Sequence, residues 1–212
     1  MTKSIEKVAT SLVKWLMPFC LLTFIPLLSS CEEDDDDDDE SEAEFENWQV
    51  RNDKVTAEWA ADQSLLKFRS YALNEKATAE NSDYIYVKVL EEGNGIGTPM
   101  LTDTVRIAYR GRLIPSKTYP EGFVFDQSFY HDFAWDKAYA AQGASWIVGV
   151  QSALLQMHVG DRWLIHIPYQ LAYGNGTGST TTIPAYSNLV FDVALFDFWH
   201  PEDSRPPFKV RK

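Results

Sequence analysis

The chain has 212 residues, of which 45% are hydrophobic and 14% aromatic, which is enough for the core of one globular domain with additional segments. Its net charge of −12 is concentrated in one stretch, because residues 32–44 carry eleven acidic side chains and no basic one. Residues 45–212 carry 19 acidic and 16 basic side chains, a net of three negative charges. This balance excludes the basic face that nucleic-acid binding requires, so we expect no nucleic acid as a partner.

The first 30 residues have the pattern of a targeting segment. A start containing three lysines precedes an apolar run from Trp15 to Leu28. This run is shorter than the roughly 20 residues of a membrane span and is typical of a signal peptide. The following Leu28-Ser29-Ser30-Cys31 resembles the lipobox of bacterial lipoproteins. We therefore interpret residues 1–30 as a lipoprotein signal peptide and Cys31 as the lipidated first mature residue, with an uncleaved anchor or a chance cysteine as alternatives.

Residues 31–44 are predicted to form an extended acidic tether, because like charges repel one another along the chain. The tether has three possible roles: a spacer, a calcium-binding loop, or an export address of the kind found in surface-exposed lipoproteins. The consecutive aspartates disfavour calcium, since EF-hand loops alternate their ligands and contain a glycine. Lipid at Cys31 would hold the protein in the bacterial cell envelope, at the outer membrane, on its periplasmic side or at the surface. Cys20 would leave with the signal peptide, so the mature chain could form no disulfide.

Residues 45–80 are predicted to be a helical arm and a linker. Ser41 and Glu44 have the spacing of a capping box at the start of a helix. The apolar residues that follow lie close to one helical face, although Asn52 and Gln63 interrupt it. These apolar residues are Trp48, Val55, Trp59 and Leu66, continued by Leu65, Phe68, Tyr71 and Leu73. We expect this face to pack on the domain that follows, or on a second copy of the chain in a homodimer.

The remaining sequence alternates in the manner of β-strands. Tyr84 to Val89 begins the first expected strand, and the glycine-rich residues 92–97 form a turn. Val159-Gly160-Asp161 has the composition of a second turn, and Pro168 ends the strand that follows it. Two strands are expected to place large apolar groups on one face, namely Trp163, Ile165 and Ile167 in one and Leu189, Phe191, Val193 and Leu195 in the other.

Five short motifs occur in a consistent order. They are Val105 to Gly111, Phe125-Asp126-x-Ser128, Trp146 to Val150, Ala172-Tyr173-Gly174 with Ile183-Pro184, and Leu189 to Val193. Over residues 84–197 this order resembles FKBP-type peptidyl-prolyl cis-trans isomerases. The resemblance implies an α+β domain at residues 81–198, in which a curled antiparallel β-sheet wraps around a short α-helix, Val150 to Met157. Residues 199–212 would be a C-terminal tail.

The same resemblance implies the site residues. The catalytic ones are Tyr109, Asp126, Ile147 and Tyr173, and the substrate-binding ones are Phe125, Trp146, Val150, Ile183 and Phe191. In the family, the backbone N–H at the Ile147 position and the hydroxyl at the Tyr173 position bind substrate carbonyls. Taken alone, Phe125, Ile183 and Phe191 would be interpreted as plain core. Asp126 is harder to explain as core, because a buried carboxylate needs partners.

Three departures from the family pattern affect the pocket. Val150 stands where the family has a tryptophan floor, which predicts a looser pocket and weak macrolide binding unless Trp146 fills the gap. His131 falls near the place of a family arginine. Phe133 and Trp135 are the candidates for a missing Phe-x-Phe motif.

The predicted function is isomerisation of X-Pro bonds in exported polypeptides. The planar amide presents a barrier of about 18–20 kcal/mol, and an apolar pocket can lower it without a nucleophile or cofactor. We expect no metal, because the four histidines lack ligand spacing. The alternatives are a chaperone that binds proline-containing segments with little turnover, or a structural surface lipoprotein. Catalysis of a proline-limited refolding reaction would distinguish them.

Overall fold

The computed structural model describes residues 44–73, 78–142, 145–176 and 182–210. The predicted signal peptide, Cys31, Ser41 of the capping box and the tether up to residue 43 lie outside these ranges. Within them, no helix combines the length and the apolar character needed to cross a membrane.

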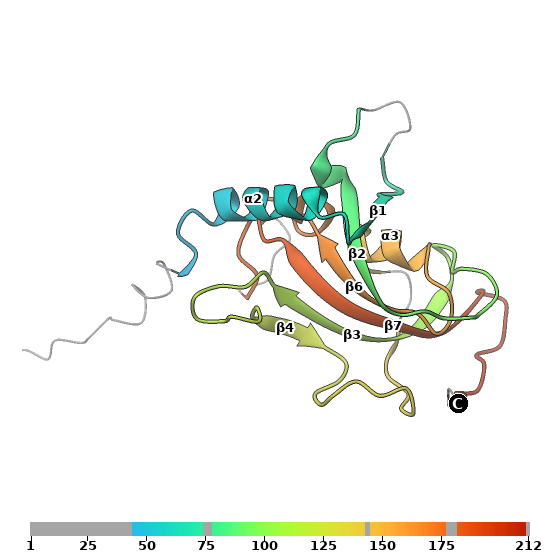
Figure 1. Cartoon of the computed structure of the whole chain (residues 1–212). Helices are drawn as coiled ribbons and strands as arrows, with labels where there is room; N and C mark the ends of the chain where they lie inside the picture. The colour runs from blue at the N-terminus through green and yellow to red at the C-terminus, as the bar shows by residue number, and fades with distance from the viewer. Residues whose placement is uncertain (1–43, 74–77, 143–144, 177–181, 211–212) are drawn as a thin grey trace, which may run out of the picture. The chain divides into compact units, whose positions relative to one another are not determined.

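One antiparallel β-sheet organises the described residues (Figure 1). Its strands run in the order β1-β2-β6-β7-β3-β4, and the short β5 pairs with β3. In chain order the elements are α2 (Trp48–Ala61), β1 (Leu66–Arg69), the 3-10 turn η1 (Asn81–Asp83), β2 (Tyr84–Glu91), β3 (Thr104–Leu113), β4 (Val124–Gln127), β5 (Ala141–Gln142), α3 (Val148–Leu154), β6 (Arg162–Ile167), the 3-10 turn η2 (Tyr169–Leu171) and β7 (Leu189–Trp199).

The core lies between α3 and the face of the sheet that we call the inner face. The predicted apolar sets of β6 and β7 are all buried there, which confirms the period of two. Helix α3 begins two residues before the expected start and ends at Leu154 rather than Met157. Gly149 allows this helix to approach β6, because a Cβ at Gly149 would lie 2.3 Å from Cγ2 of Ile167. The predicted architecture of a curled sheet around a short helix is confirmed.

The turn that leads into β6 has the predicted chemistry. Gly160 has a φ of 96°, a conformation that favours glycine. The buried Asp161 carboxylate accepts hydrogen bonds from the backbone N–H groups of His158 and Gly93, each at 2.6 Å. This carboxylate therefore joins the turn to the β2–β3 connection.

The extent of the N-terminal helix was predicted wrongly. Helix α2 ends at Ala61, and Leu66–Arg69 forms β1, which pairs with Tyr84–Val87 of β2. A short apolar run fits a helix or a strand equally well, and here the unpaired edge of β2 provides the hydrogen-bonding partner. The predicted arm thus includes a strand of the sheet.

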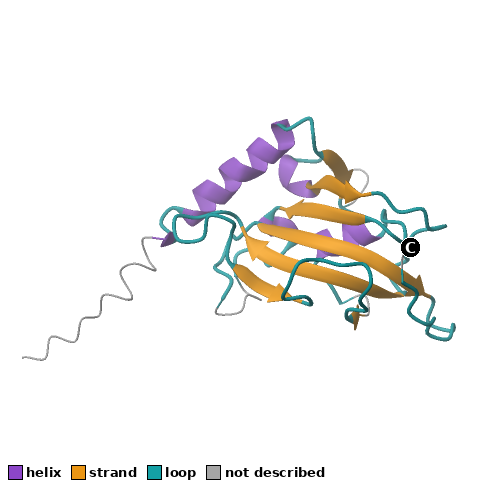
Figure 2. Cartoon of the chain, turned by 60° about the horizontal axis from the view of Figure 1, so that its bottom comes forward, coloured by secondary structure: helices purple, strands orange, loops and turns teal. Residues whose placement is uncertain are grey.

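Helix α2 packs on its own chain, which was one of the two expected partners. Its buried residues Trp48, Asn52 and Thr56 are spaced four apart and so lie on one side of the helix. Near its C-terminal end, the Trp59 ring lies 5.0 Å from that of His166, on the outer face of the sheet. Figure 2 shows α2 lying along one side of the sheet. Pairing with a second chain through this arm stays a prediction.

A second aromatic cluster covers another part of the outer face. Its buried members are Ala108, Phe129 and Ala194, with Phe133, Trp135, Tyr139 and Phe196 packed against them. Phe133 and Trp135 therefore do not replace a pocket motif, because they lie on the face opposite to α3. The predicted tail begins in the sheet, because β7 continues to Trp199, and Phe208 of the tail packs 5.8 Å from Phe196.

Candidate active site

A cavity of about 490 Å³ opens at the inner side of β3, β4 and β7. Its lining comes from these strands, from the residues that precede α3 and from those that follow η2. The lining residues are Tyr109, Phe125, Asp126, Ser145, Trp146, Ile147, Ala172, Tyr173 and Phe191. The structure thus gathers seven of the nine predicted pocket residues, although they are spread over 83 positions of the sequence from Tyr109 to Phe191.

The polar corner of the cavity is a tyrosine–carboxylate pair. The Tyr109 hydroxyl donates a hydrogen bond of 2.9 Å to Oδ2 of Asp126. Burial, together with the Asp126 carboxylate, raises the pKa of Tyr109 to about 12. Tyr109 is therefore a neutral donor at physiological pH. Asp126 itself is exposed, in agreement with its interpretation as a polar pocket residue rather than core.

Ser128 positions Tyr109 from the end of β4. The Tyr109 N–H donates to Oγ of Ser128 at 2.9 Å, and the Ser128 N–H donates to the Tyr109 carbonyl at 2.9 Å. This reciprocal pair continues the β3–β4 contact past Gln127, where β4 ends. The serine of the Phe-Asp-x-Ser motif therefore has a structural role beside the site.

Two edge-to-face aromatic pairs form the walls. The Phe125 and Phe191 rings are 5.7 Å apart, and those of Tyr109 and Trp146 are 4.8 Å apart. The first pair lies directly over Gly111, where an added Cβ would be 2.7 Å from Phe125 and 2.9 Å from Phe191. Only glycine leaves room for both rings. The sequence alone does not reveal this role, although Gly111 closes the motif that begins at Val105.

Tyr173 faces the polar corner from the segment after η2. Burial and the nearby Asp126 charge raise the pKa of Tyr173, so its hydroxyl stays protonated and can donate. The backbone around it is fixed by two hydrogen bonds, from the Gly174 N–H to the Tyr169 carbonyl and from the Tyr186 N–H to the Gly174 carbonyl. Ile147 precedes α3 on the opposite side, and its N–H has no hydrogen-bond partner in the described part of the chain.

Two predicted pocket residues do not line the cavity. Val150 has no exposed surface and Ile183 is 4% exposed, and both belong to the core. Val150 lies in the first turn of α3 and faces the sheet, whereas Trp146, just before the helix, provides the aromatic wall. His131 is likewise outside the pocket, and its carbonyl accepts a hydrogen bond from Arg110. Ser145, which precedes Trp146, and Ala172, the first residue of the Ala172-Tyr173-Gly174 motif, also line the cavity and were not predicted as site residues.

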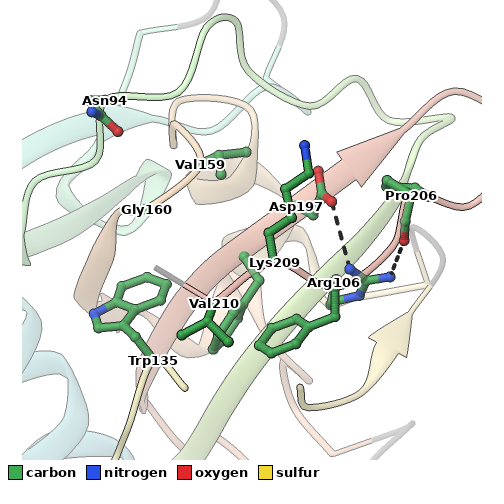
Figure 3. A pocket seen from close by; sticks show the side chains of 11 residues that line it. Asn94, Arg106, Trp135, Val159, Gly160, Asp197, Pro206, Lys209 and Val210 are labelled. Atoms are coloured by element: carbon green, nitrogen blue, oxygen red, sulfur yellow. Dashed lines mark hydrogen bonds and ion pairs between the residues drawn. The ribbon is translucent and has the colours of Figure 1, made fainter. Parts of the chain in front are cut away.

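A second hollow of about 350 Å³ lies on the outer face, under the C-terminal residues (Figure 3). Arg106 is buried in it, donates a hydrogen bond to the Pro206 carbonyl and lies 3.7 Å from Asp197. These contacts hold residues 206–210 on the sheet. Unlike the first cavity, this hollow has no tyrosine–carboxylate pair among its described lining residues. No group of histidines, cysteines and carboxylates suited to a metal occurs in the ranges that the structure describes.

Comparison with known proteins links this arrangement to one family. Residues 96–196 match the model described as FKBP-type peptidyl-prolyl cis-trans isomerase. The chain is 31% identical over 179 residues to the macrophage infectivity potentiator of Trypanosoma cruzi, which covers 84% of this chain and 80% of that protein.

Two further similarities are shorter or structural. The chain is 40% identical over 108 residues to the Homo sapiens peptidyl-prolyl cis-trans isomerase FKBP9, which covers 50% of this chain but only 17% of that protein. This chain therefore spans a small part of the length of that relative. The crystal structure of a peptidyl-prolyl cis-trans isomerase from Pseudomonas syringae pv. tomato superposes with a TM-score of 0.54 at 26% identity, covering 73% of this chain and 95% of that one.

Proposed function

Because the chain belongs to the FKBP-type peptidyl-prolyl cis-trans isomerase family, we propose that it catalyses the cis-trans isomerisation of X-Pro bonds in other polypeptides. The observation that carries this proposal is the cavity in which two aromatic walls meet the Tyr109–Asp126 pair and the Tyr173 hydroxyl. No nucleophile or general base is needed, because the reaction is a rotation about one bond.

The proposed mechanism is stabilisation of the twisted amide. A planar X-Pro amide is polar, and it loses resonance and charge separation as it rotates. The walls formed by Phe125, Phe191 and Trp146 exclude water, so they favour the less polar twisted form. The Tyr173 hydroxyl and the Ile147 N–H are free to donate to substrate carbonyls and fix the chain on either side of the proline. The hydrogen bond between Tyr109 and Asp126 fixes the polar corner of the cavity.

The test is the rate of cis-trans interconversion in a short X-Pro peptide and in a proline-limited refolding reaction. Tyr173→Phe should lower kcat/KM by about tenfold or less, the value of one net hydrogen bond. Asp126→Ala should lower it as well, by leaving the Tyr109 hydroxyl without its acceptor. Tyr139→Phe, on the outer face, is the matched control and should keep wild-type kcat/KM. Prevention of aggregation by the wild-type chain without any proline-specific rate would refute the enzyme and favour a binding chaperone.

We further propose that lipid on Cys31 anchors the protein in the bacterial cell envelope, where its substrates are exported polypeptides that contain proline. This proposal is supported by the basic start, the apolar run and the small residues before Cys31. Cys31→Ser should abolish fatty-acid labelling and leave a heavier precursor. Normal processing of that variant would refute the anchor, and protease treatment of intact cells would separate surface from periplasmic placement.

A further inference from the structure

The helix α2 buries polar side chains against the domain that holds the cavity. Asn52 is completely buried, and Thr56 nearly so. Burying an amide lowers stability unless its hydrogen bonds are made. Apolar side chains would pack the helix on the domain without this requirement. Polar groups at this position therefore specify where the helix and its partner lie relative to each other.

The partner of Asn52 is Asn188, just before β7. The Asn188 N–H donates to Oδ1 of Asn52 at 2.7 Å, and its side-chain amide donates to the Asn52 carbonyl at 2.7 Å and to Oγ1 of Thr56 at 3.0 Å. Oδ1 of Asn188 accepts the Tyr169 N–H at 2.9 Å. One side chain, with all of its amide groups used, thus connects α2 to the first residue of η2.

Tyr169 in turn fixes the cavity wall that carries Tyr173. Its carbonyl accepts the Gly174 N–H at 2.8 Å, and the Gly174 carbonyl accepts the Tyr186 N–H at 2.9 Å. Tyr186 lies two residues before Asn188. The residue between them, Ser187, is also bound by α2, because Nε1 of Trp48 donates a hydrogen bond to Oγ of Ser187 at 2.8 Å. The segment that carries Tyr173 is therefore held at both ends by residues 186–188, and α2 binds this stretch at Ser187 and Asn188.

A second connection reaches the opposite wall. The hydroxyl of Tyr71, just after β1, donates to Oε1 of Gln151 in α3. Nε2 of Gln151 donates to the Trp146 carbonyl at 2.8 Å. The same N-terminal segment thus contacts the supports of Trp146 as well as those of Tyr173.

We propose that Asn52 in α2 and Tyr71 after β1 are positioning residues of the active site, Asn52 for Tyr173 and Tyr71 for Trp146. This inference rests on the proposed isomerase function. It assigns a catalytic contribution to a segment that lies outside residues 96–196, the range matched by the family model.

The experiment measures the energetic coupling between each positioning residue and the cavity residue that it supports, in addition to the loss of activity. Asn52→Ala should lower kcat/KM about 3- to 10-fold in the otherwise unchanged chain, and less than about 2-fold when Tyr173→Phe is already present. Tyr71→Phe should behave in the same way toward Trp146→Leu. Val55→Ala is the matched control, because it weakens α2 packing without touching Asn188, and it should lower Tm while leaving kcat/KM unchanged.

A second measurement does not depend on activity. Asn52→Ala should accelerate hydrogen exchange of the Tyr169, Gly174 and Tyr186 amides. Val55→Ala should not accelerate it when the two variants are compared at the same decrease in Tm. If Asn52→Ala fails to fold, Thr56→Val removes one bond of the same network and should show the smaller form of both effects. An inactive wild-type chain would refute the proposed function and leave the exchange result to decide the coupling. Additive effects on kcat/KM, or exchange equal to that of Val55→Ala, would overturn the inference.

Discussion

Replacing Trp146 by leucine tests which residue forms the aromatic wall of the pocket. Trp146 lines the cavity and packs edge-on against Tyr109, with the two rings 4.8 Å apart. Trp146→Leu keeps an apolar side chain at the position and removes most of the flat surface available to a prolyl ring. The family pattern would instead give this role to position 150.

The size of the effect follows from the area lost. A tryptophan buries about 150–250 Å² in total. Loss of roughly 60–100 Å² of contact with a prolyl ligand, at about 25 cal/mol per Å², costs about 1.5–2.5 kcal/mol. This corresponds to a decrease in affinity of about 10- to 70-fold. The lost pair with Tyr109 should also lower the free energy of unfolding by about 0.5–1.5 kcal/mol.

The assay measures, by titration, the Kd for a short proline-containing peptide. It also measures kcat/KM for the isomerisation of that peptide. Trp135→Leu, in the aromatic cluster of the outer face, is the matched control and should change neither quantity. Val150→Trp should destabilise the protein by about 1–3 kcal/mol or more, because Val150 is fully buried in the core. Wild-type affinity in Trp146→Leu, with a tenfold loss in Val150→Ala, would refute this assignment of the wall.

Three further predictions concern the frame of the site. Gly111→Ala should lower Tm and kcat/KM together, because the added methyl must displace Phe125 or Phe191 at a cost of about 1–3 kcal/mol; unchanged thermal melting and rate would show that the walls move freely. Phe191→Ala should lower the free energy of urea unfolding by about 3–5 kcal/mol and abolish isomerisation, and retained stability would contradict its burial. Burial lowers the pKa of His166 to about 4, below its value of about 6.5 in the unfolded chain. The unfolded state therefore binds the proton first, and the free energy of urea unfolding should fall by on the order of 2–4 kcal/mol between pH 7 and pH 4, a component that His166→Leu should lack.

The sequence predicts the sheet and most of the cavity because both depend on short-range patterns. Strand β6 alternates strictly between buried and half-buried residues, and the predicted apolar residues of β7 all lie in the core. The site residues Tyr109, Asp126 and Tyr173 each lie in a motif of a few residues. The structure adds the distances that make these motifs one site, such as the 2.9 Å bond between Tyr109 and Asp126.

The features that the sequence does not predict depend on distant partners. By periodicity alone, Asn52 interrupts an apolar stripe, and its partner Asn188 lies 136 positions away. Leu66–Arg69 becomes a strand because the edge of β2 is available to it. Val150 has the family position of a floor, but its side chain is buried by the exact placement of α3, which no local pattern encodes.

The strand order has a consequence for how the chain is made. Strand β7 lies between β6 and β3 in the middle of the sheet, although it is the last strand in the sequence. The two halves of the sheet cannot join until synthesis has passed residue 199, so most of the pairing is non-local and should form slowly. Until then the growing polypeptide has no closed hydrophobic core, because the two halves of the inner face meet only on β7.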